Sequence, residues 1–165
     1  MLVEGITEEL LIKSYIRSNN ELNEVEVISF HKGYKDIIEI WLKVNKDSNN
    51  RLGVVRDYDN QELAKNEHEA YNSYKNICVK TTAGYTLETD IITTGNNADL
   101  LREKYGSEFG WEHKTDEEIE NDWRSSKSFV MFNLCKDISR GEIEGFEMPS
   151  HIKDVLDFMI SETVG

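Results

Sequence analysis

The sequence holds one proline and two cysteines in 165 residues, and each scarcity excludes a class of structure. The lack of proline excludes a long Pro-rich linker. Cys78 and Cys135 lie far apart and form no CxxC pair, and the four histidines show no HxxH or HxxxH spacing. This pattern argues against a structural zinc site and favours two buried free thiols in a reducing cytosol.

Long hydrophobic runs are also absent. The longest run, residues 129–134, is interrupted by Asn133 and is far shorter than the ~20 residues of a membrane-spanning helix. No basic segment precedes an apolar stretch at the N-terminus, so the sequence shows no signal peptide. We therefore expect a cytoplasmic protein without membrane contact.

Positive charge is in deficit, because 19 Lys and Arg stand against 32 Asp and Glu and the net charge is −13. Such a chain is not expected to hold a phosphate backbone through its general surface charge. The hydrophobic content of 38% and aromatic content of 10% exclude a disordered chain. The length predicts one domain with a sizeable core.

Apolar segments alternate with amphipathic ones, which predicts a compact α/β domain. Expected strands are 1–3, 25–30, 52–55 and 77–80, and expected helices are 7–19 (capped by the Thr7 hydroxyl), 61–73, 87–92, 98–105, 116–139 and 150–161. Residues 37–44 suit either a helix or a strand, and their length favours a helix. The order predicts a Rossmann-like, mainly parallel four-stranded sheet flanked by helices. Residues 1–110 are the expected catalytic core, and residues 111–165 a helical C-terminal extension packed on the same domain.

Acidic residues follow two of the expected strands. Glu4 ends the first strand, while Asp57 and Asp59 end the third. Because alternate residues of an extended strand point the same way, the two aspartates are expected to share a direction. Glu8 lies one helical turn beyond Glu4 and could face the same edge. If the two strands are neighbours, four carboxylates meet there and repel one another unless a cation binds; oxygen ligands select Mg²⁺ or Mn²⁺.

Each motif also has a purely structural interpretation. An Asp-x-Asp pair at a strand end can cap the following helix, and Glu4-Gly5 can be a simple turn. The presence of both motifs, each directly after an apolar strand, favours the metal site.

Two segments resemble a known family. Residues 2–8 and 52–59 resemble the signature segments of the Toprim fold, which occurs in topoisomerases, primases and the overcoming-lysogenisation-defect (OLD) nucleases. The Glu-Gly-x-Thr-Glu form is similar to the OLD branch. Residues 86–91 resemble the Leu-Glu-x-Asp stretch that supplies further metal ligands in those nucleases.

The resemblance implies roles for particular residues. Asp57 and Asp59 would be the central ligands of a site for two Mg²⁺ or Mn²⁺ ions, with Glu4 as a ligand or general base. The further ligands that it implies are Glu8, Glu88 and Asp90.

A basic residue of the C-terminal helical part acts near the scissile phosphate in the OLD nucleases. Lys127 is our candidate, with Lys136 or Arg140 behind it, and a solvated helix lysine is an equally weighted interpretation of Lys127. Arg56 departs from the small residue that the family commonly has there. It could pair with a carboxylate or contact a phosphate.

The function that the resemblance implies is that of a metal-dependent endonuclease or nickase, a hydrolase of phosphodiester bonds serving in phage defence. DNA is the first expected substrate, with RNA as an alternative. A different class, a non-catalytic metal-binding regulatory or interaction module of an ATPase complex, is kept open. Nucleotidyl transfer as in primases is less favoured, because the chain has neither the zinc nor the basic modules that primases use.

OLD nucleases usually carry an ATPase domain before the Toprim domain, whereas this chain starts at the first strand. We therefore expect a separate ATPase partner or an excised domain. Bound divalent ions would bring the charge of the six acidic residues of the site near neutrality. The rest of the chain still has more acidic than basic residues, which predicts weak intrinsic affinity for nucleic acid. Association with further copies of the chain is left open by the sequence.

Overall fold

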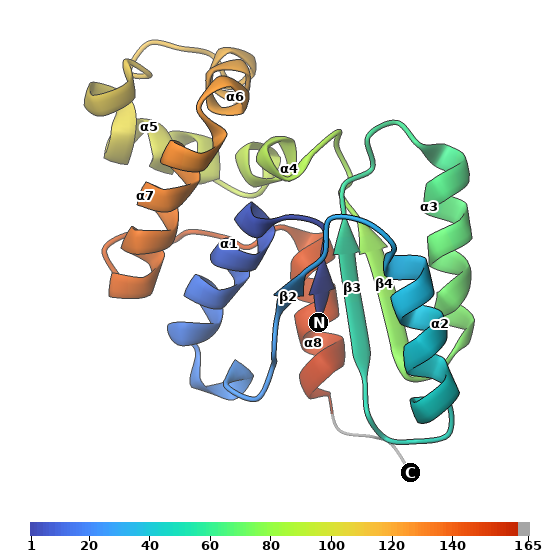
Figure 1. Ribbon diagram of the computed structural model, residues 1–165. Helices are drawn as coiled ribbons and strands as arrows, with labels where there is room; N and C mark the ends of the chain where they lie inside the picture. The colour runs from blue at the N-terminus through green and yellow to red at the C-terminus, as the bar shows by residue number, and fades with distance from the viewer. Residues whose placement is uncertain (162–165) are drawn as a thin grey trace.

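The computed structural model describes residues 1–161 and contains one parallel sheet (Figure 1). Its strands are β1 (Leu2–Val3), β2 (Ile28–Ser29), β3 (Leu52–Arg56) and β4 (Ile77–Thr81). They are all parallel, in the spatial order β2-β1-β3-β4. The predicted α/β class with a four-stranded, Rossmann-like parallel sheet and a helical C-terminal part is confirmed.

Within residues 1–161, eight α-helices connect and cover the strands. They are α1 (Ile6–Arg17), α2 (Tyr34–Asn45), α3 (Glu62–Glu69), α4 (Leu87–Thr93), α5 (Asn97–Phe109), α6 (Asp116–Ser125), α7 (Lys127–Arg140) and α8 (Ser150–Ile160). Two short 3₁₀ helices, η1 (Asn20–Leu22) and η2 (Ala70–Ser73), follow α1 and α3.

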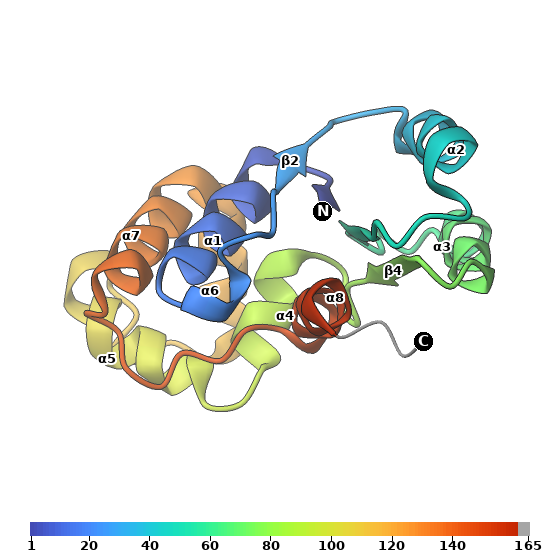
Figure 2. The ribbon, with the colours of Figure 1, turned by 90° about the horizontal axis from the view of Figure 1, so that it is seen from below.

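Helices cover both faces of the sheet over β1, β3 and β4 (Figure 2). Leu2 and Val54 point into a core formed with α2 and η2, whereas Val3 and Val55 point into the larger core on the opposite face. Neighbouring strand residues alternate between faces, so β1 and β3 each contribute to both cores, whereas the edge strand β2 contributes to neither. On the second face α1 and α8 lie against the sheet, and α7 packs along α1.

Helix α8 approaches β3 very closely. A Cβ atom on Gly53 would lie 2.3 Å from the Val155 side chain, so only glycine lets the helix pack at this distance. The last helix of the C-terminal segment, residues 111–165, is thus part of the layer that covers β3 and β4.

Several predicted boundaries are wrong. The strand expected over 25–30 is limited to Ile28–Ser29, because its neighbour β1 offers only two residues for pairing. The single helix expected over 116–139 is two helices, since the backbone at Ser126 leaves helical geometry (φ −126°, ψ 30°). The helix expected over 61–73 becomes a 3₁₀ helix from Ala70 onward.

Two other expectations can be compared with the structure. Cys135 is buried but Cys78 is half-buried, so the expectation of two buried thiols holds for one of them; both are free. Within residues 1–161, no helix combines the length and apolar character needed to cross a membrane.

Candidate functional site

The candidate site lies at the carboxyl ends of β1 and β3. Because these strands are parallel neighbours, Glu4 and Asp57, which follow them, lie side by side. The backbone N–H of Asp57 donates to Glu4 Oε2 at 3.2 Å. A hollow of about 370 Å³ opens here, and Glu8, His31 and Lys127 also line it. Of the four carboxylates expected to meet at the strand ends, Glu4, Glu8 and Asp57 line this hollow, whereas Asp59 does not.

Glu8 enters this hollow from the first turn of α1 and is 4% exposed. Gly5 makes room for it, because a Cβ at Gly5 would lie 2.6 Å from Glu8 Oε2. The Thr7 hydroxyl donates to the same oxygen at 3.1 Å. The expectation that Thr7 caps the helix is wrong: Gly5 is the N-cap residue, and Thr7 orients the carboxylate of Glu8 instead.

Glu88 and Lys127 form an ion pair at the site. Glu88, in the first turn of α4, is completely buried, and its Oε1 lies 3.0 Å from Lys127 Nζ. Apart from this ion pair, neither carboxylate oxygen has a hydrogen-bonding partner in residues 1–161. The break at Ser126 makes Lys127 the first residue of α7, which directs its side chain to the site rather than to solvent.

Burial raises the pKa of Asp57 to about 8, and the negative charges of Glu8, Glu88 and Glu4 contribute in the same direction. The ammonium group of Lys127 only partly opposes this effect. Burial opposes the charge on Lys127 itself, but the nearby Glu88, Glu8 and Asp57 outweigh it and raise the pKa of the lysine. The site therefore favours protons or cations on its carboxylates.

Asp57 also has a structural role. Its Oδ1 accepts the backbone N–H of Leu87, the first residue of α4, at 3.0 Å. The structural interpretation of the Asp-x-Asp motif thus applies in part, because Asp57 does cap a helix. The helix is α4, however, and not α3, which follows Asp57 in the chain.

Asp59 does not extend alongside Asp57, so that expectation is wrong. β3 ends at Arg56, and Asp59 and Asn60 have positive φ angles of 50° and 55°. The extended geometry on which the expectation depended is absent there. Asp59 still lies near Glu4, whose pKa is raised by burial, lowered by Arg56, and raised further by the charge of Asp59.

Asp90 lies apart from the acidic cluster. It is two residues beyond Glu88 on α4, and residues at this spacing point to different sides of a helix. Its carboxylate accepts the backbone N–H groups of Ala83 (2.8 Å) and Gly84 (2.6 Å) and contacts His151 Nδ1 at 2.9 Å. Burial works against its charge, but these partners prevail and lower the pKa of Asp90. The geometry assigns Asp90 to fixing the β4–α4 loop.

Of the three basic candidates, Lys127 is the one at the site. Lys136 and Arg140 lie further along α7, roughly 13 and 20 Å away at 1.5 Å per residue. Lys136 pairs with Asp137 at 3.5 Å, and Arg140 is exposed in the last turn.

Arg56 is buried beneath the site. Its Nε lies 3.8 Å from Glu4 Oε2 and donates to the Asp57 carbonyl at 3.2 Å, while its guanidinium lies over the Tyr34 ring. Of the two sequence-based alternatives, pairing with a carboxylate is the one observed. His31 was not predicted as a site residue, although it lies two residues after the end of β2, so a search of the segments that follow each strand could have found it.

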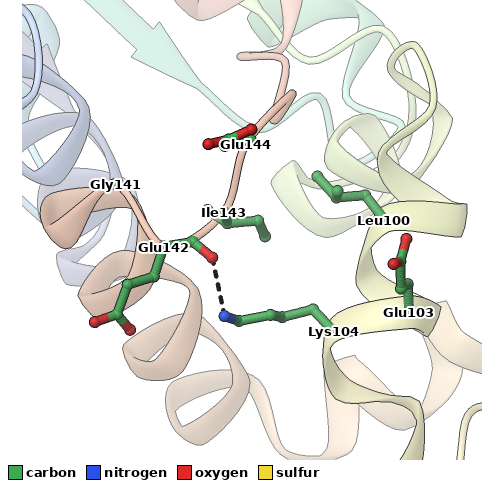
Figure 3. A pocket seen from close by; sticks show the side chains of 7 residues that line it. All are labelled: Leu100, Glu103, Lys104, Gly141, Glu142, Ile143 and Glu144. Atoms are coloured by element: carbon green, nitrogen blue, oxygen red, sulfur yellow. Dashed lines mark hydrogen bonds between the residues drawn. The ribbon is translucent and has the colours of Figure 1, made fainter.

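A second hollow, of about 490 Å³, lies between α5 and the segment after α7 (Figure 3). Lys104 Nζ donates to the Glu142 carbonyl across it at 2.9 Å and also pairs with Asp137. None of the predicted site residues lines it, and its acidic side chains, Glu103, Glu142 and Glu144, do not suit a phosphate group.

The candidate metal ligands of the site, Glu4, Glu8, Asp57 and Glu88, suit a hard cation, since all of them offer carboxylate oxygens. Within residues 1–161, however, no three Asp, Glu, His or Cys side chains are already grouped closely enough to hold a metal ion. The Lys127 ammonium lies among the acids, and Asp57 Oδ1 is engaged with Leu87. A metal ion would require side-chain movement, above all of Lys127.

Comparison with known proteins adds no relative: the chain matches no family model, no curated protein and no solved structure. The Toprim resemblance therefore remains a prediction from residues 2–8, 52–59 and 86–91.

Proposed function

We propose that this chain is a metal-dependent nuclease of the Toprim type, similar to the OLD branch, that hydrolyses phosphodiester bonds. One observation carries the proposal. Glu4, Glu8, Asp57 and Glu88, from three separate segments, meet with Lys127 at the carboxyl ends of β1 and β3. Ligand sites of open parallel sheets lie at this edge.

In this proposal Glu8, Asp57 and Glu88 hold Mg²⁺ or Mn²⁺ through carboxylate oxygens. Two such ions, when bound, activate a water molecule and offset charge on the phosphate. Lys127, released from Glu88, donates a hydrogen bond to a phosphate oxygen. Glu4, whose side chain is 34% exposed, is accessible to accept a proton from water, and Arg56 holds it in place.

The substrate we propose is DNA, with RNA as the alternative. The net charge of −13 disfavours strong binding of either by this chain alone. We therefore propose that an ATPase partner supplies most of the affinity, in a system of phage defence.

A second candidate is a regulatory module that binds metal without cleaving nucleic acid. The Glu88–Lys127 ion pair favours it, because an internal ammonium already compensates part of the acidic charge. In this reading Lys127 is exchanged for a metal ion and never contacts a phosphate.

A nicking assay distinguishes the two candidates. Supercoiled plasmid, single-stranded DNA and RNA are incubated with the chain, alone and with a co-purifying ATPase, in Mg²⁺, Mn²⁺ or EDTA. Asp57→Asn keeps an oxygen for the Leu87 N–H while removing the charge, so it tests the chemistry at an intact fold. Asp157→Asn, on the exposed side of α8, is the matched control.

The nuclease proposal expects metal-dependent cleavage that is lost in Asp57→Asn and Lys127→Met and retained in Asp157→Asn. The absence of cleavage with every metal and partner overturns it. Calorimetric Mn²⁺ binding without cleavage, lost in Asp57→Asn, supports the regulatory module.

A further inference from the structure

A stripe of exposed apolar side chains runs along α2. Ile37, Ile40 and Val44 are 36%, 62% and 80% exposed. Their i, i+3, i+7 spacing places them on one side of the helix. Ile38 and Leu42 already bury the core-facing side of α2, so the stripe is additional to what the fold requires.

The stripe faces away from α3. Lys35 and Glu39 point toward α3 and η2, where they contact Glu67 at 3.4 Å and the Tyr71 hydroxyl at 2.6 Å. At about 100° per residue, Lys35 and Glu39 lie about 140° and 100° around α2 from Ile40, on the side away from Ile37 and Val44. The stripe therefore faces away from both the core and α3, on a helix that lies at the margin of the molecule (Figure 2).

Ile28 of the edge strand β2 is a further exposed apolar side chain on the side of the sheet that α2 covers. It is in register with Leu2, whose side chain points to the α2 face of the sheet, so Ile28 points to that face too. It is 50% exposed, because α2 does not cover the edge strand. We refer to Ile37, Ile40 and Val44 as the edge patch.

Two charged residues of opposite sign lie beside the stripe. Asp36 precedes it and Lys43 lies near its other end, both on the solvent side of α2. Neither forms an ion pair with any residue in the described part of the chain. Two copies of α2 packed antiparallel would bring Asp36 of each next to Lys43 of the other, whereas a parallel arrangement would pair like charges.

We propose that the edge patch binds a second copy of this chain in a two-fold symmetric dimer. The α2 helices pack antiparallel and cross near Ile40, which buries the patch, and Asp36 pairs with Lys43 of the partner copy. A two-fold interface must be self-complementary, and this charge pattern meets that condition. The patch is small, so the dimer is weak and concentration-dependent. The inference is independent of the proposed nuclease activity.

Sedimentation velocity from low-micromolar to near-millimolar concentration tests the dimer. The unmodified chain is expected to shift from monomer to dimer. Ile40→Glu and Val44→Glu are expected to weaken association by about tenfold or more. Leu63→Glu is the matched control, because Leu63 on α3 is 85% exposed but lies outside the patch; association should be unchanged. Circular dichroism confirms that each variant is folded.

Charge reversal tests the antiparallel arrangement. Asp36→Lys and Lys43→Asp should each weaken the dimer, and the double variant should restore it. In a Cys78→Ser background, Ile40→Cys should form a disulfide-linked dimer on mild oxidation, while Leu63→Cys should not. A chain that stays monomeric throughout, or a dimer insensitive to Ile40→Glu, overturns the proposal. A double variant no tighter than the single ones overturns the antiparallel pairing.

Discussion

Replacing Asp57 by asparagine is expected to stabilise the metal-free protein, and increasingly so as the pH rises. Asp57 is buried among other carboxylates, which raises its pKa from 3.8 to about 8. The folded protein therefore holds a proton on Asp57 in a pH range where the unfolded chain has already released it. Asparagine resembles the protonated aspartic acid in shape and still accepts the Leu87 N–H.

The sign and size follow from linkage. A group whose pKa is raised on folding contributes stability that is complete below about pH 4 and is lost as the pH rises through about 8. At about 1.36 kcal/mol per pH unit, wild type should lose about 4 kcal/mol between about pH 5 and pH 8 that Asp57→Asn retains.

Urea unfolding in EDTA at a series of pH values measures this difference. The two proteins should have similar free energies of unfolding near pH 5 and diverge toward pH 8. Adding Mn²⁺ at pH 8 should stabilise wild type and not the variant, because the metal binds the ionised carboxylate. If the two free energies stay parallel over the whole range, Asp57 titrates normally and the reasoning about its burial is refuted.

Three further substitutions test other contacts. Lys127→Met should lower the free energy of unfolding by about 3 kcal/mol, since it leaves Glu88 buried and unpaired, and adding Glu88→Gln should recover most of it in the same urea assay. Asp90→Ala should cost about 2 to 4 kcal/mol by leaving two backbone N–H groups of the β4–α4 loop unpaired. Calorimetry should show its Mn²⁺ affinity unchanged, and a lost affinity in a folded variant would return Asp90 to the set of ligands. Gly53→Ala should lower stability by about 1 to 3 kcal/mol through a clash with Val155, and an unchanged melting temperature would show that α8 can shift without cost.

The sequence by itself was sufficient for the fold class. Short apolar segments alternating with amphipathic ones, at the spacing of strand–helix–strand units, leave few arrangements other than a parallel sheet covered by helices. It also placed Glu4 and Asp57 at strand ends, and their proximity followed once β1 and β3 proved to be neighbours. Both results depend on local periodicity and on short-range connection rules, which a single sequence carries.

The membership of the acidic cluster was decided only by the tertiary structure. The left-handed backbone at Asp59, the direction of Asp90 toward His151 and the loop N–H groups, and the helix break before Lys127 all depend on packing between segments distant in the chain. A one-residue change of helix phase, or one residue in a turn, points a side chain in a different direction. The energetic cost of that change is smaller than the energy of the contacts that the side chain gains. Spacing in the sequence therefore identified the edge of the sheet, whereas the fold determined which carboxylates meet there and that a lysine lies among them.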